Sequence, residues 1–181
     1  VVLLEAMLDD AEARVRKNFA NSELSDEDVR RIATGAIKFS DFMADRKTGI
    51  LYDPNKIFAL TGYSGPFCQY ADVRLRRILE KNKDFVRVDF ADYDFEAEKE
   101  VLNVLNRFPE LVAGIVERLE LHKIAAYCFE LAQVLNRYYE KTPISQAEDK
   151  ERSARLWLVE KADFVLAKAL DLLGVEIPEK M

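Results

Sequence analysis

Apolar residues recur at spacings of three and four along most of this chain, and this period constrains its fold more than any other feature. Leu4, Leu8, Ala11, Val15 and Phe19 form one such stripe, as expected for the buried face of a helix. The 181 residues include only 6 Gly and 5 Pro, so few residues interrupt a helix. The sequence therefore predicts an all-α fold, a bundle of antiparallel helices with short connections.

Capping and breaking residues mark where these helices begin and end. Ser25 is a candidate N-cap, the helix after it should fail near Gly49, and Pro54 and Pro66 each fit the first turn of a helix. In the short helix after Pro54, Leu60 should face inward. The expected later helices, by approximate residue range, are 66–81, 101–108, 111–119, 121–141 and 148–173.

The segment between residues 82 and 100 has no helical period. Residues 85–90 alternate in polarity like a strand, but no second strand is available to pair with them, so an extended linker is expected. Five acids follow in the segment 92–100, among them Glu98. This acidic run is expected to stay solvated.

The amino-acid composition argues against several functions. The single histidine, His122, excludes a two-histidine metal site, and the two cysteines, Cys68 and Cys128, are too far apart for metal-ligand spacing. We expect reduced, partly buried thiols of a cytoplasmic protein. No apolar run approaches the ~20 residues of a membrane span. A net charge of −6 argues weakly against nucleic-acid binding. We therefore expect no catalytic residues, no metal and no membrane partner.

Two blocks of sequence resemble arginyl-tRNA synthetases. The first is residues 35–42 (GAIKFSDF) with 60–74 (LTGYSGPFCQYADVR), which carries Gly-Pro, an aromatic residue, one further residue, Gln-Tyr, and Arg four residues beyond the Tyr. The second block comprises residues 121–127 (LHKIAAY), 131–132, 136–139 (NRYY), 154–156, 170–175 (LDLLGV) and 178–181 (PEKM). In order and spacing the two blocks are similar to the part of that family that follows the catalytic domain.

The resemblance implies a helical segment over residues 1–62, after a catalytic domain that the chain lacks, and a DALR-type anticodon-binding domain over 63–181. The start at Val1 rather than Met fits such a fragment. The family's catalytic motifs need two histidines and a Met-Ser pair, and neither occurs here. We expect no aminoacylation and no cofactor in this chain, because ATP and Mg belong to the catalytic domain. The implied partners are that domain and tRNA(Arg), and not DNA.

The resemblance implies that five residues of this chain contact the anticodon: Phe67, Tyr70, Arg74, Tyr139 and Met181. Unpaired bases are read by stacking on aromatic rings and by hydrogen bonds to their edges. The first three lie three and four apart on one helix, and therefore on one face. The rings could instead belong to the core, and Met181 could lie in a frayed terminus.

A basic stretch continues from this motif and comprises Arg74, Arg76, Arg77, Lys81, Lys83 and Arg87. It predicts a patch facing phosphates, with Arg77 and Lys81 as contacts, although some members could pair with Glu80 and Asp84. Two departures from the family affect the expected contacts. Phe67 cannot donate a hydrogen bond where many members have Tyr, and Asp72 puts a negative charge between Tyr70 and Arg74. The competing interpretation is a structural helical bundle that contacts a partner protein.

Overall fold

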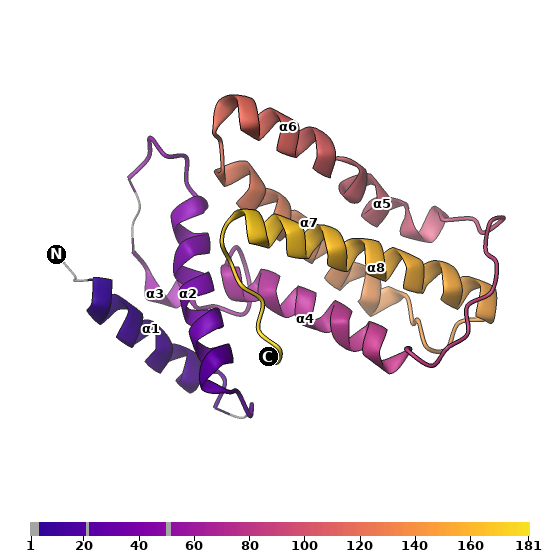
Figure 1. Cartoon of the computed structure of the whole chain (residues 1–181), viewed down its shortest axis with the longest axis horizontal. Helices are drawn as coiled ribbons and strands as arrows, with labels where there is room; N and C mark the ends of the chain where they lie inside the picture. Colours follow the sequence, from indigo (N-terminus) through magenta and orange to yellow (C-terminus); the bar gives the residue numbers. More distant parts are fainter. Residues whose placement is uncertain (1–3, 21, 50–51) are drawn as a thin grey trace.

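The computed structural model describes residues 4–20, 22–49 and 52–181 (Figure 1). Val1, on which the expected fragment start depends, lies outside these ranges. All regular secondary structure in the described ranges is helical, which confirms the all-α prediction. The elements are α1 (Leu4–Asn18), α2 (Asp26–Phe42), α3 (Pro54–Ile57), α4 (Gly65–Lys81), the 3-10 helix η1 (Glu96–Glu98), α5 (Lys99–Asn106), α6 (Phe108–Arg118), α7 (His122–Lys141) and α8 (Asp149–Leu172).

The apolar core falls into two clusters that meet along α4. The larger joins α4, α5, α7 and α8 and also takes Phe39 from α2. The smaller joins α1, α2 and α3 with Val73 of α4 and Met181 at the chain end. The division at residue 62 stays a prediction, because Val73 and Met181 pack in the cluster of the first segment. Helix α4 therefore supports both parts of the molecule.

Helix α2 begins as predicted but ends earlier. The Ser25 hydroxyl accepts a hydrogen bond from the Asp28 backbone N–H at 3.1 Å, which satisfies an N–H of the first turn. The helix ends at Phe42 rather than near Gly49, because the chain turns at Asp45, whose carboxylate accepts from the Lys47 N–H at 2.8 Å. In the segment after α3, the inward orientation expected of Leu60 is wrong, since this side chain is exposed.

Helix α4 is placed against α2 by its first turn. The Ser64 hydroxyl accepts from the Phe67 N–H at 3.3 Å and donates to the Ala59 carbonyl at 2.6 Å. A Cβ on Gly65 would lie 2.9 Å from Phe39 Cβ and 3.0 Å from the carbonyl oxygen of Gly35. The two helices approach so closely here that only glycine fits.

The linker after α4 is extended, as predicted, and lies along α8. The Val88 N–H donates to the Ser153 hydroxyl at 3.0 Å, and Arg87 forms a two-bond ion pair with Glu160 at 2.9 and 2.5 Å. The expectation that the following acidic run stays solvated is wrong for Glu98, which is 0% exposed. Its carboxylate accepts hydrogen bonds from Tyr138 and Arg155 inside the bundle, and these donors offset the cost of burying the charge.

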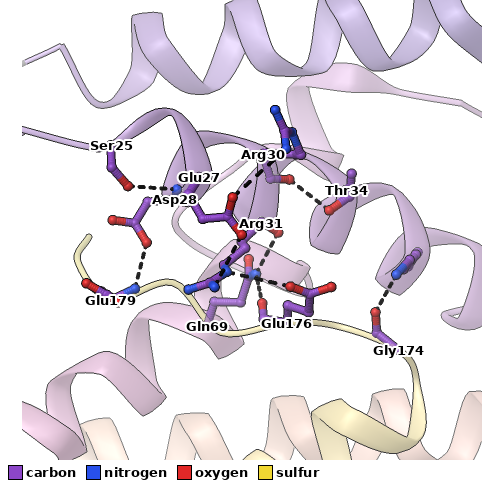
Figure 2. Close-up of polar contacts among 11 residues, drawn as sticks. Ser25, Glu27, Asp28, Arg30, Arg31, Thr34, Gln69, Gly174, Glu176 and Glu179 are labelled. Atoms are coloured by element: carbon purple, nitrogen blue, oxygen red, sulfur yellow. Dashed lines mark hydrogen bonds and ion pairs between the residues drawn. The ribbon is translucent and has the colours of Figure 1, made fainter.

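The last residues cross from α8 to α2 and α4, as the yellow tail in Figure 1 shows. Gln69 of α4 is 0% exposed and fixes this crossing. Its side-chain amide nitrogen donates to the Glu176 carbonyl of the tail at 2.7 Å and to the Arg31 carbonyl of α2 at 3.1 Å (Figure 2). One buried side chain thus joins α2, α4 and the tail. We call it the Gln69 clamp.

Gly35 provides the space for the Gln69 clamp. A Cβ at this position would lie 2.5 Å from the Gln69 Nε2 atom and 3.1 Å from Val175 Cγ1. A glycine inside a helix costs about 1 kcal/mol relative to alanine. Two further bonds fix the tail on α2, from the Glu179 N–H to the Asp28 carboxylate at 2.7 Å and from Lys38 to the Gly174 carbonyl at 2.7 Å.

Replacement of the clamp tests its contribution to stability. Gln69→Met keeps the volume but leaves two buried carbonyls without their donor, and we expect the free energy of unfolding to fall by roughly 1–3 kcal/mol. Urea denaturation measures it. The matched control is Gln133→Met, at an exposed position of α7, which should stay within about 0.5 kcal/mol of the parent. Equal stability of the two variants would show that the clamp contributes nothing.

Asp72 lies on the opposite side of α4 from the aromatic motif. Its carboxylate is fully buried, 2.8 Å from the Arg76 guanidinium, which also lies 3.6 Å from Asp163 of α8. Burial raises the pKa of Asp72 to about 7, against the opposing effect of Arg76. The raised pKa means that the folded state holds this proton more tightly than the unfolded chain does, so the parent loses stability as the pH rises from about 4 towards 7.

Asp72→Asn removes this titration. At each pH we compare the free energy of unfolding of the variant with that of the parent. We expect this difference to favour the variant by about 1–3 kcal/mol more at pH 8 than at pH 5. Denaturation curves of both proteins at the two pH values measure the difference. Asp171→Asn, on the exposed side of α8, is the control and should give the same small change at both. A pH-independent effect of Asp72→Asn would contradict the assigned titration.

Candidate nucleic-acid interface

Four of the predicted contact residues form one exposed ridge on α4. Tyr70, Arg74, Arg77 and Lys81 follow one another at spacings of four, three and four residues, so their side chains leave the helix on the same side. Tyr70 is 39% exposed, and Arg77 and Lys81 are exposed as well. We call these four residues the α4 ridge. It offers one aromatic ring and three cationic groups to a ligand.

Ion pairs divide the predicted basic stretch into two halves. Arg76 pairs with Asp72, Lys83 with Glu80 at 2.6 Å, and Arg87 with Glu160. These three cations are therefore engaged with carboxylates of the protein itself. The other three have no ion pair with any residue in the described ranges, and they are the cations of the α4 ridge.

Phe67, Tyr70 and Arg74 line a shallow hollow between α4 and α7. Its volume is about 350 Å³, and α7 contributes the other wall. Phe67 is only partly buried and packs on Phe129, with ring centroids 5.4 Å apart. The residues of this hollow to which the sequence assigned no contact role are Leu60, Gln133, Asn136, Arg137 and Glu140. The spacing of the last four along α7 indicated a shared helix face, but it did not indicate that this face meets α4.

Tyr139 lies on the same side of the molecule, next to Arg74. The Arg74 guanidinium lies 5.5 Å from the centroid of the Tyr139 ring, a cation–π contact. The Tyr139 ring is partly buried, and its hydroxyl is buried without a hydrogen-bond partner in the described part of the chain. Burial raises the pKa of this hydroxyl far above its ordinary value, so it stays protonated and can donate.

Met181 lies beside the ridge but not in the open. Its side chain is 8% exposed and packs in the cluster of α1, α2 and α3, so the terminus is held against the fold. Its backbone carbonyl accepts a hydrogen bond from the Arg77 guanidinium at 3.0 Å. The structure thus places Tyr139 on one flank of Arg74, and Met181 next to Arg77. Asp72 faces away from this surface, towards Arg76 and Asp163, so its charge does not lie between Tyr70 and Arg74 on the ridge.

Comparison with known proteins places this geometry in a family. The family model of the DALR anticodon binding domain matches residues 68–181, more than half of the chain. The chain belongs to the DALR anticodon-binding domain family. This match covers the second sequence block and confirms the DALR-type domain that the resemblance implied.

The chain is also similar to named relatives over its whole length. It is 36% identical to the arginine–tRNA ligases of Lactococcus lactis and Streptococcus pneumoniae and covers 33% of each. The solved arginyl-tRNA synthetase of Thermus thermophilus matches all of the chain with a TM-score of 0.94 and 31% identity, over 32% of that protein. The Plasmodium falciparum enzyme, with 19% identity and a TM-score of 0.82, shows the fold alone. The chain spans about a third of the length of these relatives.

The adjacent tyrosines of α7 provide a test of the site geometry. Tyr138 donates to the buried Glu98 carboxylate at 2.9 Å, so Tyr138→Phe should lower the free energy of unfolding by roughly 1.5–3 kcal/mol. Tyr139→Phe removes a buried hydroxyl without a partner in the described residues, so it should leave the free energy of unfolding unchanged or raise it. Urea denaturation of both variants measures the contrast. A large loss for Tyr139→Phe would show that its hydroxyl is bonded.

Proposed function

We propose that this chain is the anticodon-reading part of an arginyl-tRNA synthetase and binds tRNA(Arg). The observation that carries the proposal is the α4 ridge, where three cations and an aromatic ring share one face and none of the three cations has an ion pair within the described ranges. A flexible anticodon offers bases that can stack and phosphates that can contact cations. Phe67, Tyr139 and Met181 border this surface, and we assign all of them to the contact region.

The parts of the surface can act on different features of the RNA. Tyr70 is exposed enough to stack on a base, a contact worth about 1–3 kcal/mol by alanine substitution. Arg77 and Lys81 can contact phosphates, which position the RNA without reading its sequence. Phe67 and Tyr139 are set deeper, so a base reaches them only by entering a hollow beside α4.

The whole enzyme would ligate arginine to tRNA(Arg) in the cytoplasm. ATP and Mg would act in the catalytic domain, which we propose as the second partner of this chain. The chain alone should be inactive in aminoacylation and need no cofactor. No helix in the described residues is long and apolar enough to cross a bilayer. The alternative, a helical bundle that only contacts a protein, is not favoured, because the family match is to an anticodon-binding domain.

The direct test is a binding titration of the chain with an arginine tRNA and with the same tRNA changed at the middle anticodon base. The titrations are made at low and at moderate salt. We expect the unchanged tRNA to bind more tightly than the changed one, and its affinity to fall as salt rises. Equal affinity for the two would leave only a nonspecific basic surface and would contradict the proposal.

The division of the basic stretch gives a matched pair of variants. Lys81→Gln removes a ridge cation and should reduce the slope of log K against log salt by about 1, because one fewer counterion is released. Lys83→Gln removes a lysine that already pairs with Glu80 and should leave the slope nearly unchanged. Titrations over a salt series measure both slopes. Equal losses for the two variants would contradict the assignment of the ridge.

A further inference from the structure

The loop after α7 forms one wall of a second hollow beside Tyr139. Residues 142–145 surround a volume of about 210 Å³ together with Arg74, Ile78, Lys81, Asn82 and Tyr139. Loop residues are positioned less firmly than helix residues. A base in this hollow would therefore meet a wall whose position depends on what holds the loop.

The Glu98 carboxylate accepts hydrogen bonds from three separate elements. It accepts from Tyr138 of α7 at 2.9 Å, from Arg155 of α8 at 3.2 Å and from Tyr93 of the linker at 3.3 Å. Tyr138 is also in edge-on contact with Tyr139, with ring centroids 5.4 Å apart. The buried carboxylate therefore holds the residue directly next to Tyr139.

Arg155 connects this carboxylate to the loop. Its Nε atom donates to Glu98, its Nη1 atom donates to the Pro143 carbonyl at 2.9 Å, and its Nη2 atom pairs with Glu151 at 2.5 Å. The planar guanidinium holds these three acceptors in fixed directions, which a lysine ammonium cannot reproduce. One side chain thus fixes the loop relative to α8 and to Glu98.

We propose that Glu98 and Arg155 are positioning residues for anticodon discrimination, acting through Tyr138 on one flank of Tyr139 and through Pro143 on the other. The inference rests on the proposed function. A buried ion pair is often no more stabilising than an apolar pair of similar volume, so stability alone is a weak reason for it. Its geometric effect is specific, since both arms of the network end at the hollow beside Tyr139.

The test compares Arg155→Lys with Arg87→Lys in the 181-residue chain. Both variants keep the charge and lose a guanidinium that pairs with a glutamate at α8, but Arg87 contacts Glu160 and not the loop. The probes are an arginine tRNA and the same tRNA with a changed middle anticodon base. The readout is the ratio of their dissociation constants, with urea denaturation of each variant in parallel.

Arg155→Lys should reduce this ratio by about three- to tenfold, because a loosened wall discriminates less well. Its affinity for the changed tRNA should stay within about twofold of the parent, since the α4 ridge cations are intact. Arg87→Lys should keep the parent ratio. If Arg155→Lys does not fold, Glu98→Gln replaces it, because the amide keeps the size of the side chain, and the same loss is expected.

Two other outcomes distinguish a failure of this inference from a failure of the proposed function. A parent chain that discriminates and an Arg155→Lys variant that discriminates equally, even if less stable, would limit the pair to a structural role and overturn the inference alone. A parent chain that binds both tRNAs equally would overturn the proposed function and the inference with it.

Discussion

A single buried amide joins the three segments whose packing positions the open face of the molecule. Gln69 donates from α4 to a carbonyl of α2 and to a carbonyl of the tail, in a space that Gly35 leaves open. A buried carbonyl without a donor is costly, so these bonds fix the relative position of three segments that are distant in sequence. The two hydrophobic clusters meet at the same helix. The orientation of α4 therefore decides both how the molecule packs and which of its faces remains open.

The open face follows from that orientation. With Gln69 and Val73 turned towards α2 and the tail, and Asp72 turned towards α8, the residues at Tyr70, Arg74 and Lys81 are left on the outside. The tail that the Gln69 clamp holds also brings the Met181 carbonyl to Arg77. A chain with net charge −6 can still offer a local cationic surface in this way, because three cations on one face of α4 have no ion pair with the described residues.

Sequence reasoning recovered what depends on local period and missed what depends on long-range pairing. Capping residues such as Ser25 and the helical apolar stripes predicted most helices within a few residues, and the spacing of Tyr70 and Arg74 predicted their common face. The burial of Glu98 could not be predicted, because its donors come from α7 and α8. The partition of the six cations was predictable only in part: pairing with Glu80 was an open alternative, whereas the pair between Arg87 and Glu160 depends on a tertiary contact.

The most direct test of the account is to map the RNA contact surface by NMR, with the labelled chain and an anticodon stem-loop of tRNA(Arg). The account predicts that chemical-shift changes concentrate on the α4 ridge, on Phe67, on Tyr139 and the loop 142–145, and on the end of the tail near Met181. Changes centred on another face, such as the outer side of α6 or α8, would contradict the claim that the α4 surface reads the anticodon.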